Sequence, residues 1–153
     1  MRKAVLSSLV LLILLIPGCS RNDEVNSVYE IGENMFITQI DDINLNYREY
    51  LGRTIKLEGL FMQNHWAGVD SYYVIRNAPG CCGDDGEVGF QVSWETPYEE
   101  DAGDDKRTYP KTSDWVEAQG ELKSYERSGI IFVYIALSEL NVLEKRGAEF
   151  VNR

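Results

Sequence analysis

RTIKLEGLFMQ (residues 53–63) is the stretch that decides the fold. Its residues alternate, with Ile55, Leu57 and Gly59 on one face and charged residues on the other, as in a β-strand with one buried side. A glycine in the middle of a strand leaves no side chain to pack, and it often marks a bulge or a tight bend at the corner of a barrel. The stretch therefore predicts a strand with a bulge or barrel corner at Gly59.

More strands are predicted on both sides of this stretch. Their residue ranges are 71–77, 87–95, 114–125 and 130–143, with an irregular strand at 35–45 that alternates only in part. The alternation in the last strand slips between Leu137 and Leu140, which predicts a β-bulge. Residues 47–52 predict a single helical turn that is closed by Gly52.

These elements predict a mainly β fold. Five or six strands, one short helical turn and glycines within strands fit a small OB-like β-barrel, because closure of the sheet removes its edges. We assign the barrel domain to residues 34–145. A polar tether over residues 19–33 precedes it, and a charged tail over residues 146–153, expected to fray, follows it.

The first 18 residues predict a secretory signal peptide. A basic start precedes an apolar run over residues 4–16, which is short for a membrane span, and Pro17-Gly18-Cys19 follows. A cysteine in this position resembles the lipobox of bacterial lipoproteins, and the resemblance implies cleavage before Cys19 and lipid attachment to it. The protein would then be anchored in the cell membrane or outer membrane and face the periplasm or the exterior. Ordinary signal cleavage and an uncleaved anchor are the alternatives.

Charge limits the kinds of partner that this chain can bind. The formal net charge is −10, and removal of residues 1–18, which include Arg2 and Lys3, takes it to −12. Binding to a nucleic-acid backbone needs Lys and Arg to replace counterions, so no nucleic-acid partner is expected. So acidic a chain is not drawn to an anionic bilayer by charge, which leaves the lipid as its tether to the membrane.

NAPGCCGDDG (residues 77–86) is the stretch that most resembles a functional site. It places two adjacent thiols in a glycine-rich turn, and these are the only thiols left once the N-terminal cysteine is lipidated. Thiolates bind Zn²⁺ and Cu(I), so the pair predicts a zinc or copper site whose shell a histidine or an acidic residue completes. The candidate metal ligands are Cys81, Cys82, His65, Asp84 and Asp85.

Two other interpretations of the cysteine pair stay open. The thiols could form a vicinal disulfide that opens and closes as a redox pair, although no helix N-terminus or neighbouring base is evident that would lower a thiol pKa. Alternatively the pair is structural, either packed as small hydrophobic side chains or locked as an inert disulfide.

The residues around the pair resemble a known bacterial family. Arg76, the cysteine pair, Asp85, Val88-Gly89 and Val92 resemble the C-terminal domain of the DUF1980 (YcgQ-like) proteins. The segments Asp114–Gly120 and Gly52–Gly59 extend this similarity over roughly residues 44–143. The resemblance implies an OB-like domain, a membrane permease as the partner, and Cys81-Cys82 as the functional position.

No catalytic arrangement is visible, so we do not expect an enzyme. The chain has a single histidine and no nucleophile motif, and no glycine-rich phosphate loop precedes a helix. Aromatic residues on the strands could line a ligand face, or they could belong to the core: Tyr72, Tyr73, Tyr125, Tyr134, Trp94 and Trp115. We therefore predict a lipid-anchored binding module whose cysteine turn holds a soft metal ion or supports a membrane transporter. The alternatives are a structural or interaction module of the cell envelope and, third, a thiol redox protein.

Overall fold

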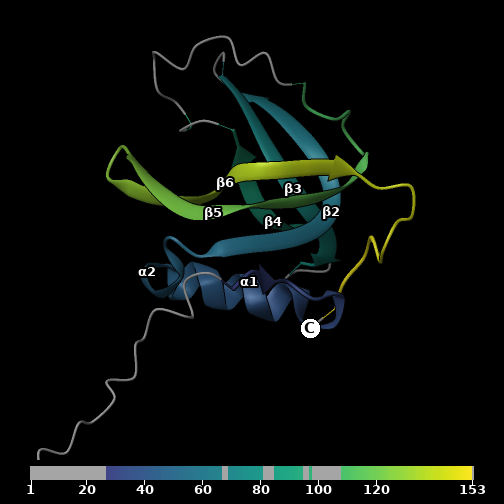
Figure 1. Cartoon of the computed structure of the whole chain (residues 1–153), viewed down its shortest axis with the longest axis horizontal. Coiled ribbons are helices and arrows are strands. Elements are labelled where there is room, and N and C mark those ends of the chain that lie inside the picture. Colours follow the sequence, from purple (N-terminus) through teal and green to yellow (C-terminus); the bar gives the residue numbers. More distant parts are fainter. Residues whose placement is uncertain (1–26, 67–68, 81–84, 95–96, 98–107, 153) are drawn as a thin grey trace, which may run out of the picture.

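The computed structural model describes residues 27–66, 69–80, 85–94, 97 and 108–152, and it consists of a closed five-stranded β-barrel with a helix packed against it (Figure 1). The barrel strands are β2 (Thr54–Trp66), β3 (Val69–Pro79), β4 (Asp85–Ser93), β5 (Trp115–Arg127) and β6 (Ile130–Val142). They follow one another around the barrel in the order β2-β3-β4-β6-β5, and β5 pairs with β2 to close it. Only the β4–β6 pair within the barrel is parallel. This arrangement confirms the predicted small OB-like barrel.

Strand β2 closes the barrel because its two halves pair with different neighbours. Residues from Thr54 to Leu60 pair with β5, and residues from Leu60 to Trp66 pair with β3. Gly59 lies at this change of partner, where a Cβ atom would stand 2.4 Å from the carbonyl oxygen of Ile75. The predicted barrel corner at Gly59 is therefore confirmed, and its cause is the close approach of the neighbouring backbone.

Two more glycines permit the same kind of close approach. A Cβ atom on Gly89 in β4 would lie 2.0 Å from the carbonyl oxygen of Val74, and one on Gly120 in β5 would lie 2.1 Å from that of Ala136. The bulge predicted in the last strand is also present. Gln119 pairs with Glu139 and Gly120 with Leu137, so Ser138 is the extra residue on β6.

Residues 36–45 form a helix, so the strand predicted at 35–45 is wrong. The helix is α1 (Phe36–Leu45), and it is preceded by the 3₁₀ helix η1 (Glu33–Met35). Its buried residues, Phe36, Ile37, Ile40 and Ile43, recur at helical rather than strand spacing, and they pack into the core beside the barrel strands. The predicted helical turn is α2 (Tyr47–Tyr50), and Gly52 after it has a φ of +82°.

The ordered domain extends further in both directions than the predicted range 34–145. At the start, β1 (Tyr29–Glu30) pairs in parallel with β2, and Ile31 is buried, so the end of the predicted tether belongs to the fold. At the other end, the tail expected to fray is docked on β3. Val151 is buried, and the backbone of Asn77 bonds with both Glu149 and Val151. Within the described residues, no helix has the length and apolar character that a membrane crossing needs.

Candidate functional site

Of the predicted metal ligands, the structure describes His65 and the backbone of Asp85. Cys19, Cys81, Cys82 and Asp84 lie outside the described residues. Asp85 begins β4, and its backbone pairs with Pro79 at the end of β3. In the part of the chain that the structure describes, no three His, Cys, Asp or Glu side chains gather in a way that could hold a metal ion.

His65 of β2 lies beside the start of β3, whereas Asp85 of β4 lies beside its end. His65 pairs with Asp70 near the start of β3, whereas Pro79 at the far end pairs with Asp85. The nine residue-to-residue steps of β3 from Asp70 to Pro79 span roughly 30 Å. Since metal ligands lie about 2 Å from their ion, His65 cannot share an ion with Asp85 in one chain.

His65 instead contacts an acidic neighbour on the surface. Its Nδ1 lies 2.7 Å from Oδ1 of Asp70, and both side chains are exposed. The hydrogen bond from His65 lowers the pKa of Asp70 below its usual value. The contact is explained by the β2–β3 register, which places the two residues opposite each other.

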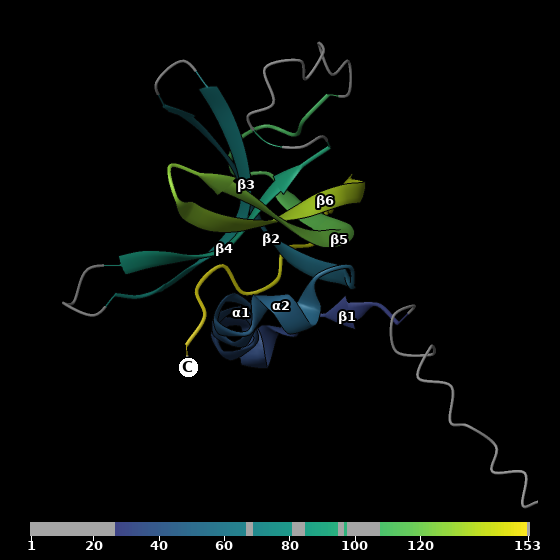
Figure 2. The ribbon, with the colours of Figure 1, turned by 90° about the vertical axis from the view of Figure 1, so that its left-hand side faces the viewer.

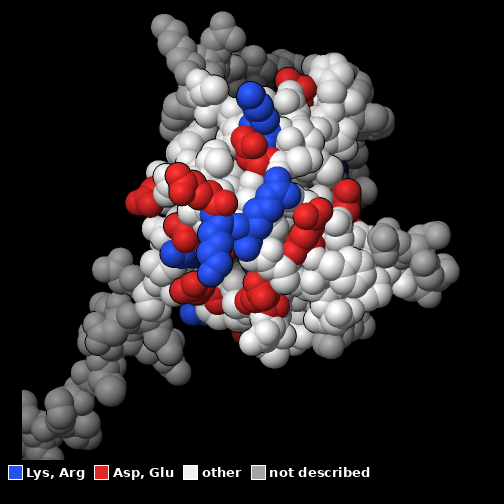
Figure 3. Space-filling model, turned by 90° about the vertical axis from the view of Figure 1, so that its right-hand side faces the viewer, with Lys and Arg blue, Asp and Glu red and all other residues white. Residues whose placement is uncertain are grey.

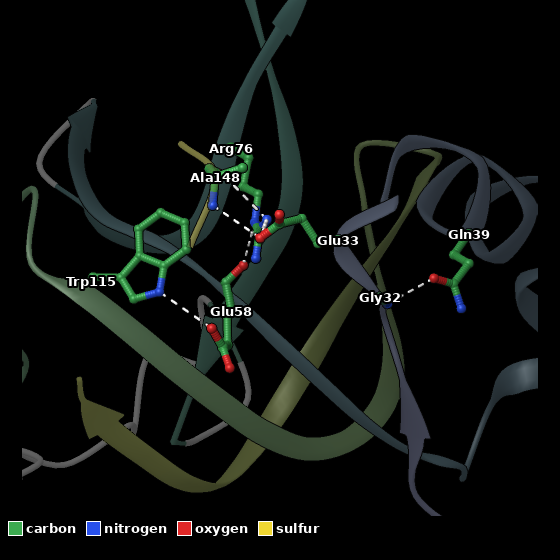
Figure 4. A network of polar contacts seen from close by, with 7 residues as sticks. All are labelled: Gly32, Glu33, Gln39, Glu58, Arg76, Trp115 and Ala148. Carbon is green, nitrogen blue, oxygen red and sulfur yellow. Dashed lines mark hydrogen bonds and ion pairs between the residues drawn. The ribbon is translucent and has the colours of Figure 1, made fainter. Parts of the chain in front are cut away.

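Arg76 of β3 forms the most extensive polar network of the described chain (Figure 4). Its side chain is only 3% exposed, and the guanidinium lies 4.7 Å from the ring centroid of Phe36 and 4.9 Å from that of Trp115. Its Nε donates to the carbonyl oxygen of Glu58 at 2.9 Å, and its Nη1 donates to that of Ala148 at 3.1 Å. Arg76 therefore connects β2, β3, helix α1 and the C-terminal tail.

Glu33 completes the network from the N-terminal side. Its Oε2 accepts a hydrogen bond from the backbone nitrogen of Ala148 at 3.0 Å and another from Arg76 Nη1 at 3.2 Å. These two bonds, the one from Ala148 first, lower the pKa of Glu33. In the sequence, Arg76 stood out only through the family resemblance. In a β-strand, residues two apart point to the same face, and Val74, two residues before Arg76, is fully buried. The strand period therefore predicts that the Arg76 side chain points inward.

The aromatic residues that the sequence suggested for a ligand face are divided among three places. Tyr72 stacks on Tyr109, with ring centroids 3.7 Å apart, and Trp115 joins the Arg76 network, where its Nε1 donates to Glu58 Oε2 at 3.3 Å. Tyr73 and Tyr125 line an open cavity of about 400 Å³ between β3, β4, the β5–β6 hairpin and the end of α1.

This cavity is shaped by aromatic and amide side chains. The Tyr125 hydroxyl donates to Gln91 Oε1 at 2.8 Å, and the Tyr125 ring stacks on Phe132 with centroids 5.3 Å apart. Tyr134, which the sequence grouped with them, is buried and meets the Tyr125 ring edge-on. The cavity is therefore a surface feature that the sequence suggested only in part.

Comparisons with known proteins identify a family. No curated protein matches this chain. Among solved structures, it is similar to the dimeric N-terminal domain of PriB protein from Thermoanaerobacter tencongensis, with 14% identity and a TM-score of 0.33 over 60% of this chain and 97% of that one. The sequence model of the DUF1980 C-terminal domain matches residues 19–151, which is most of the chain. The protein, with its OB-like barrel and its Arg76 network, therefore belongs to the DUF1980 C-terminal domain family.

Proposed function

We propose that the protein is a lipid-anchored, non-enzymatic module of the bacterial cell envelope that binds zinc or copper through Cys81 and Cys82 and serves a membrane transporter. The observation that carries the proposal is the register of the β3–β4 hairpin. Its ladder continues to the pair Pro79–Asp85, and the two strands extend away from the barrel (Figure 2). The residues between them in the sequence include both cysteines.

The other residues of the family pattern support this emphasis on the cysteine pair. Gly59, Gly89 and Gly120 permit close approach of neighbouring strands. Arg76 and Trp115 belong to the buried network that joins the two ends of the domain to the barrel. Because these residues build the barrel, the cysteine pair is the part of the pattern to which we assign the function.

Two thiolates from one turn would fill only part of the shell of a metal ion. Zinc in proteins is usually tetrahedral, so two further ligands are needed. Asp84 and Asp85 follow in the sequence, and His65 is too far along β3 to take part. A shell left partly open is suited to passing the ion to a second protein, which agrees with service to a transporter.

Metal titration of the full-length protein tests this proposal. Under reducing conditions, we expect one Zn²⁺ or Cu⁺ to bind per chain, with an affinity that rises with pH because the thiols must lose their protons. Cys81→Ser/Cys82→Ser should weaken binding at least about 100-fold, whereas His65→Asn should leave it unchanged. Equal affinities in the wild type and the double serine variant would exclude a thiolate site.

The same variants separate the two alternatives. If the pair is structural, the double serine variant melts at a lower temperature whether or not metal is present. If the pair is a redox couple, the intact mass of the untreated protein rises by two hydrogen atoms upon mild reduction.

A further inference from the structure

One end of the barrel presents apolar side chains to solvent. The β5–β6 hairpin turns there at Ser128–Gly129, both with positive φ. The next three residues, Ile130, Ile131 and Phe132, are 58%, 48% and 39% exposed. Because successive strand residues point to opposite faces, the tip of this hairpin exposes apolar surface on both of its faces.

The neighbouring elements add apolar surface at the same end. The last turn of α1 is adjacent to the hairpin, because Asn44 lines the same cavity as Ile131. The turn after α2 contacts β5 farther from the tip, where the backbone nitrogen of Gly52 donates to the carbonyl oxygen of Leu122, six residues before Ser128. Figure 2 shows the β5–β6 hairpin, α1, α2 and β1 on this side of the molecule.

Exposed apolar residues are distributed unevenly over the described chain. Nine large apolar side chains are exposed in the described residues. Four of them lie at the hairpin tip or at the adjacent end of α1: Leu45, Ile130, Ile131 and Phe132. Two more, Val28 before β1 and Leu51 after α2, flank elements on the same side of the molecule. The remaining three lie elsewhere, as Val142 does at the far end of β6. Single exposed apolar residues are ordinary on a protein surface, whereas a group of them on one side indicates an interaction surface.

The opposite side of the molecule is charged. Figure 3 shows Lys and Arg side chains next to Asp and Glu side chains over that side. There Glu58 shares an open cavity with Lys145 and Arg146, and Arg146 forms an ion pair with Glu149 at 3.6 Å.

The proposed anchor limits how far this side of the barrel can lie from the membrane. Ser27, where the described chain starts, lies next to Val28 and β1, whose Tyr29 ring packs edge-on against Tyr50 of α2. From Cys19 to Ser27 the chain can span at most about 28 Å, even if it is fully extended. A lipid on Cys19 would thus hold the apolar end of the barrel close to the bilayer.

We propose that this apolar end rests on the lipid surface, with Ile130, Ile131 and Phe132 inserted at the membrane–water interface. The inference rests on the lipid anchor of the proposed function and adds a second contact to it. Glu126 and Arg127 beside the turn have opposite charges, whereas α1 and α2 carry exposed Asp41, Arg48 and Glu49, so the contact is confined to the apolar tip of the hairpin. Tyr125 adds an amphipathic ring beside Phe132, which is typical of interfacial positions.

Amide hydrogen exchange on the full-length, lipidated protein tests the contact. The protein is bound to vesicles of pure phosphatidylcholine and compared with the Cys19→Ala variant free in solution. We expect exchange of residues 127–133 to slow at least about fivefold on the vesicles, and that of residues 142–151 to stay unchanged. Ile131→Ser/Phe132→Ser should abolish this vesicle protection of residues 127–133, whereas Val142→Ser, which alters an equally exposed apolar residue of the same strand, should not.

Flotation of the vesicles distinguishes failure of this inference from failure of the anchor. If the wild-type protein floats with the vesicles but residues 127–133 exchange as in solution, the lipid contact is refuted and the anchor stands. If the wild-type protein does not float, the anchor fails and the inference falls with it. Protection that occurs in native membranes but not on pure lipid would also refute the inference, because it would indicate a protein partner at the hairpin tip.

Discussion

Gly89→Ala should destabilise the barrel strongly, because β4 passes very close to β3 at this residue. An added Cβ would lie 2.0 Å from the carbonyl oxygen of Val74 and 2.7 Å from the Cα of Ile75. Contacts of a Cβ below 3.0 Å essentially do not occur in proteins, so the two strands must separate by about 1 Å. Overpacking of this kind costs about 1–3 kcal/mol. The loss of two ladder hydrogen bonds at about 1 kcal/mol each brings the expected cost to about 3–5 kcal/mol.

Gly86→Ala in the same strand is the matched control. Its nearest neighbour would be the carbonyl oxygen of Ala78 at 3.6 Å, which is an ordinary contact, and its φ is not positive. We expect this variant to be as stable as the wild type or more stable by about 0.4–1 kcal/mol, since alanine restricts the unfolded chain. The two substitutions change the same atoms in one strand and differ only in the space available.

Urea unfolding, followed by tryptophan fluorescence, measures both variants. For a domain of this size, 3–5 kcal/mol corresponds to a fall in melting temperature of roughly 10–15 °C, which calorimetry can check. If Gly89→Ala and Gly86→Ala have the same denaturation midpoint, the close approach of β4 to β3 is not a feature of the protein in solution, and the reasoning about barrel closure is refuted.

Other consequences follow from the network and the tail. Arg76→Met should lower the free energy of unfolding by about 2–4 kcal/mol, because it leaves two backbone carbonyl oxygens without their donor, and urea midpoints will show it. The lowered pKa of Glu33 stabilises the fold above the unfolded value of about 4.3, and this contribution is lost as the pH falls through the lower folded value. The stability difference between wild type and Glu33→Gln should therefore shrink in urea titrations below about pH 5, and a constant difference would contradict this role. Val151→Ala should cost about 1–2 kcal/mol by thermal unfolding, whereas Asn152→Ala, at an exposed neighbour, should change stability by less than about 0.5 kcal/mol.

Local pattern was sufficient to predict the five barrel strands. In β2 the buried residues alternate as predicted, and in β5 Val116, Ala118 and Leu122 are fully buried. In β3 and β4 the alternation is interrupted, because three successive residues are buried in each strand. The barrel corner at Gly59 and the β-bulge before Leu140 could also be predicted. A bend or an extra residue interrupts the two-residue period of a strand at its own position in the sequence.

The helix α1 was mistaken for a strand because its apolar run is short. Phe36 and Ile37 are adjacent, and Ile40 and Ile43 follow at helical spacing, but an 11-residue window contains few repeats of either period. A helix of 10 residues is only marginally stable by itself in water, so α1 depends on packing of its apolar face against the barrel.

The candidate site shows a different limit. The types of its residues were visible, but the sequence contains no measure of the distance between His65 and Asp85. That distance depends on β3 running without a break from its pairing with β2 to its pairing with β4, which places the two hairpin connections at opposite ends of one strand.

The sequence by itself determined the five barrel strands, the bend of the barrel and the presence of two adjacent thiols, because each depends on neighbouring residues and their chemistry. Only the tertiary structure decided that the C-terminal tail docks on β3, that Arg76 is buried between Phe36 and Trp115, and that the exposed tip of the β5–β6 hairpin lies beside the end of α1. The physical reason is that these features arise from contacts between segments far apart in the chain, and closure of the barrel is what brings those segments together.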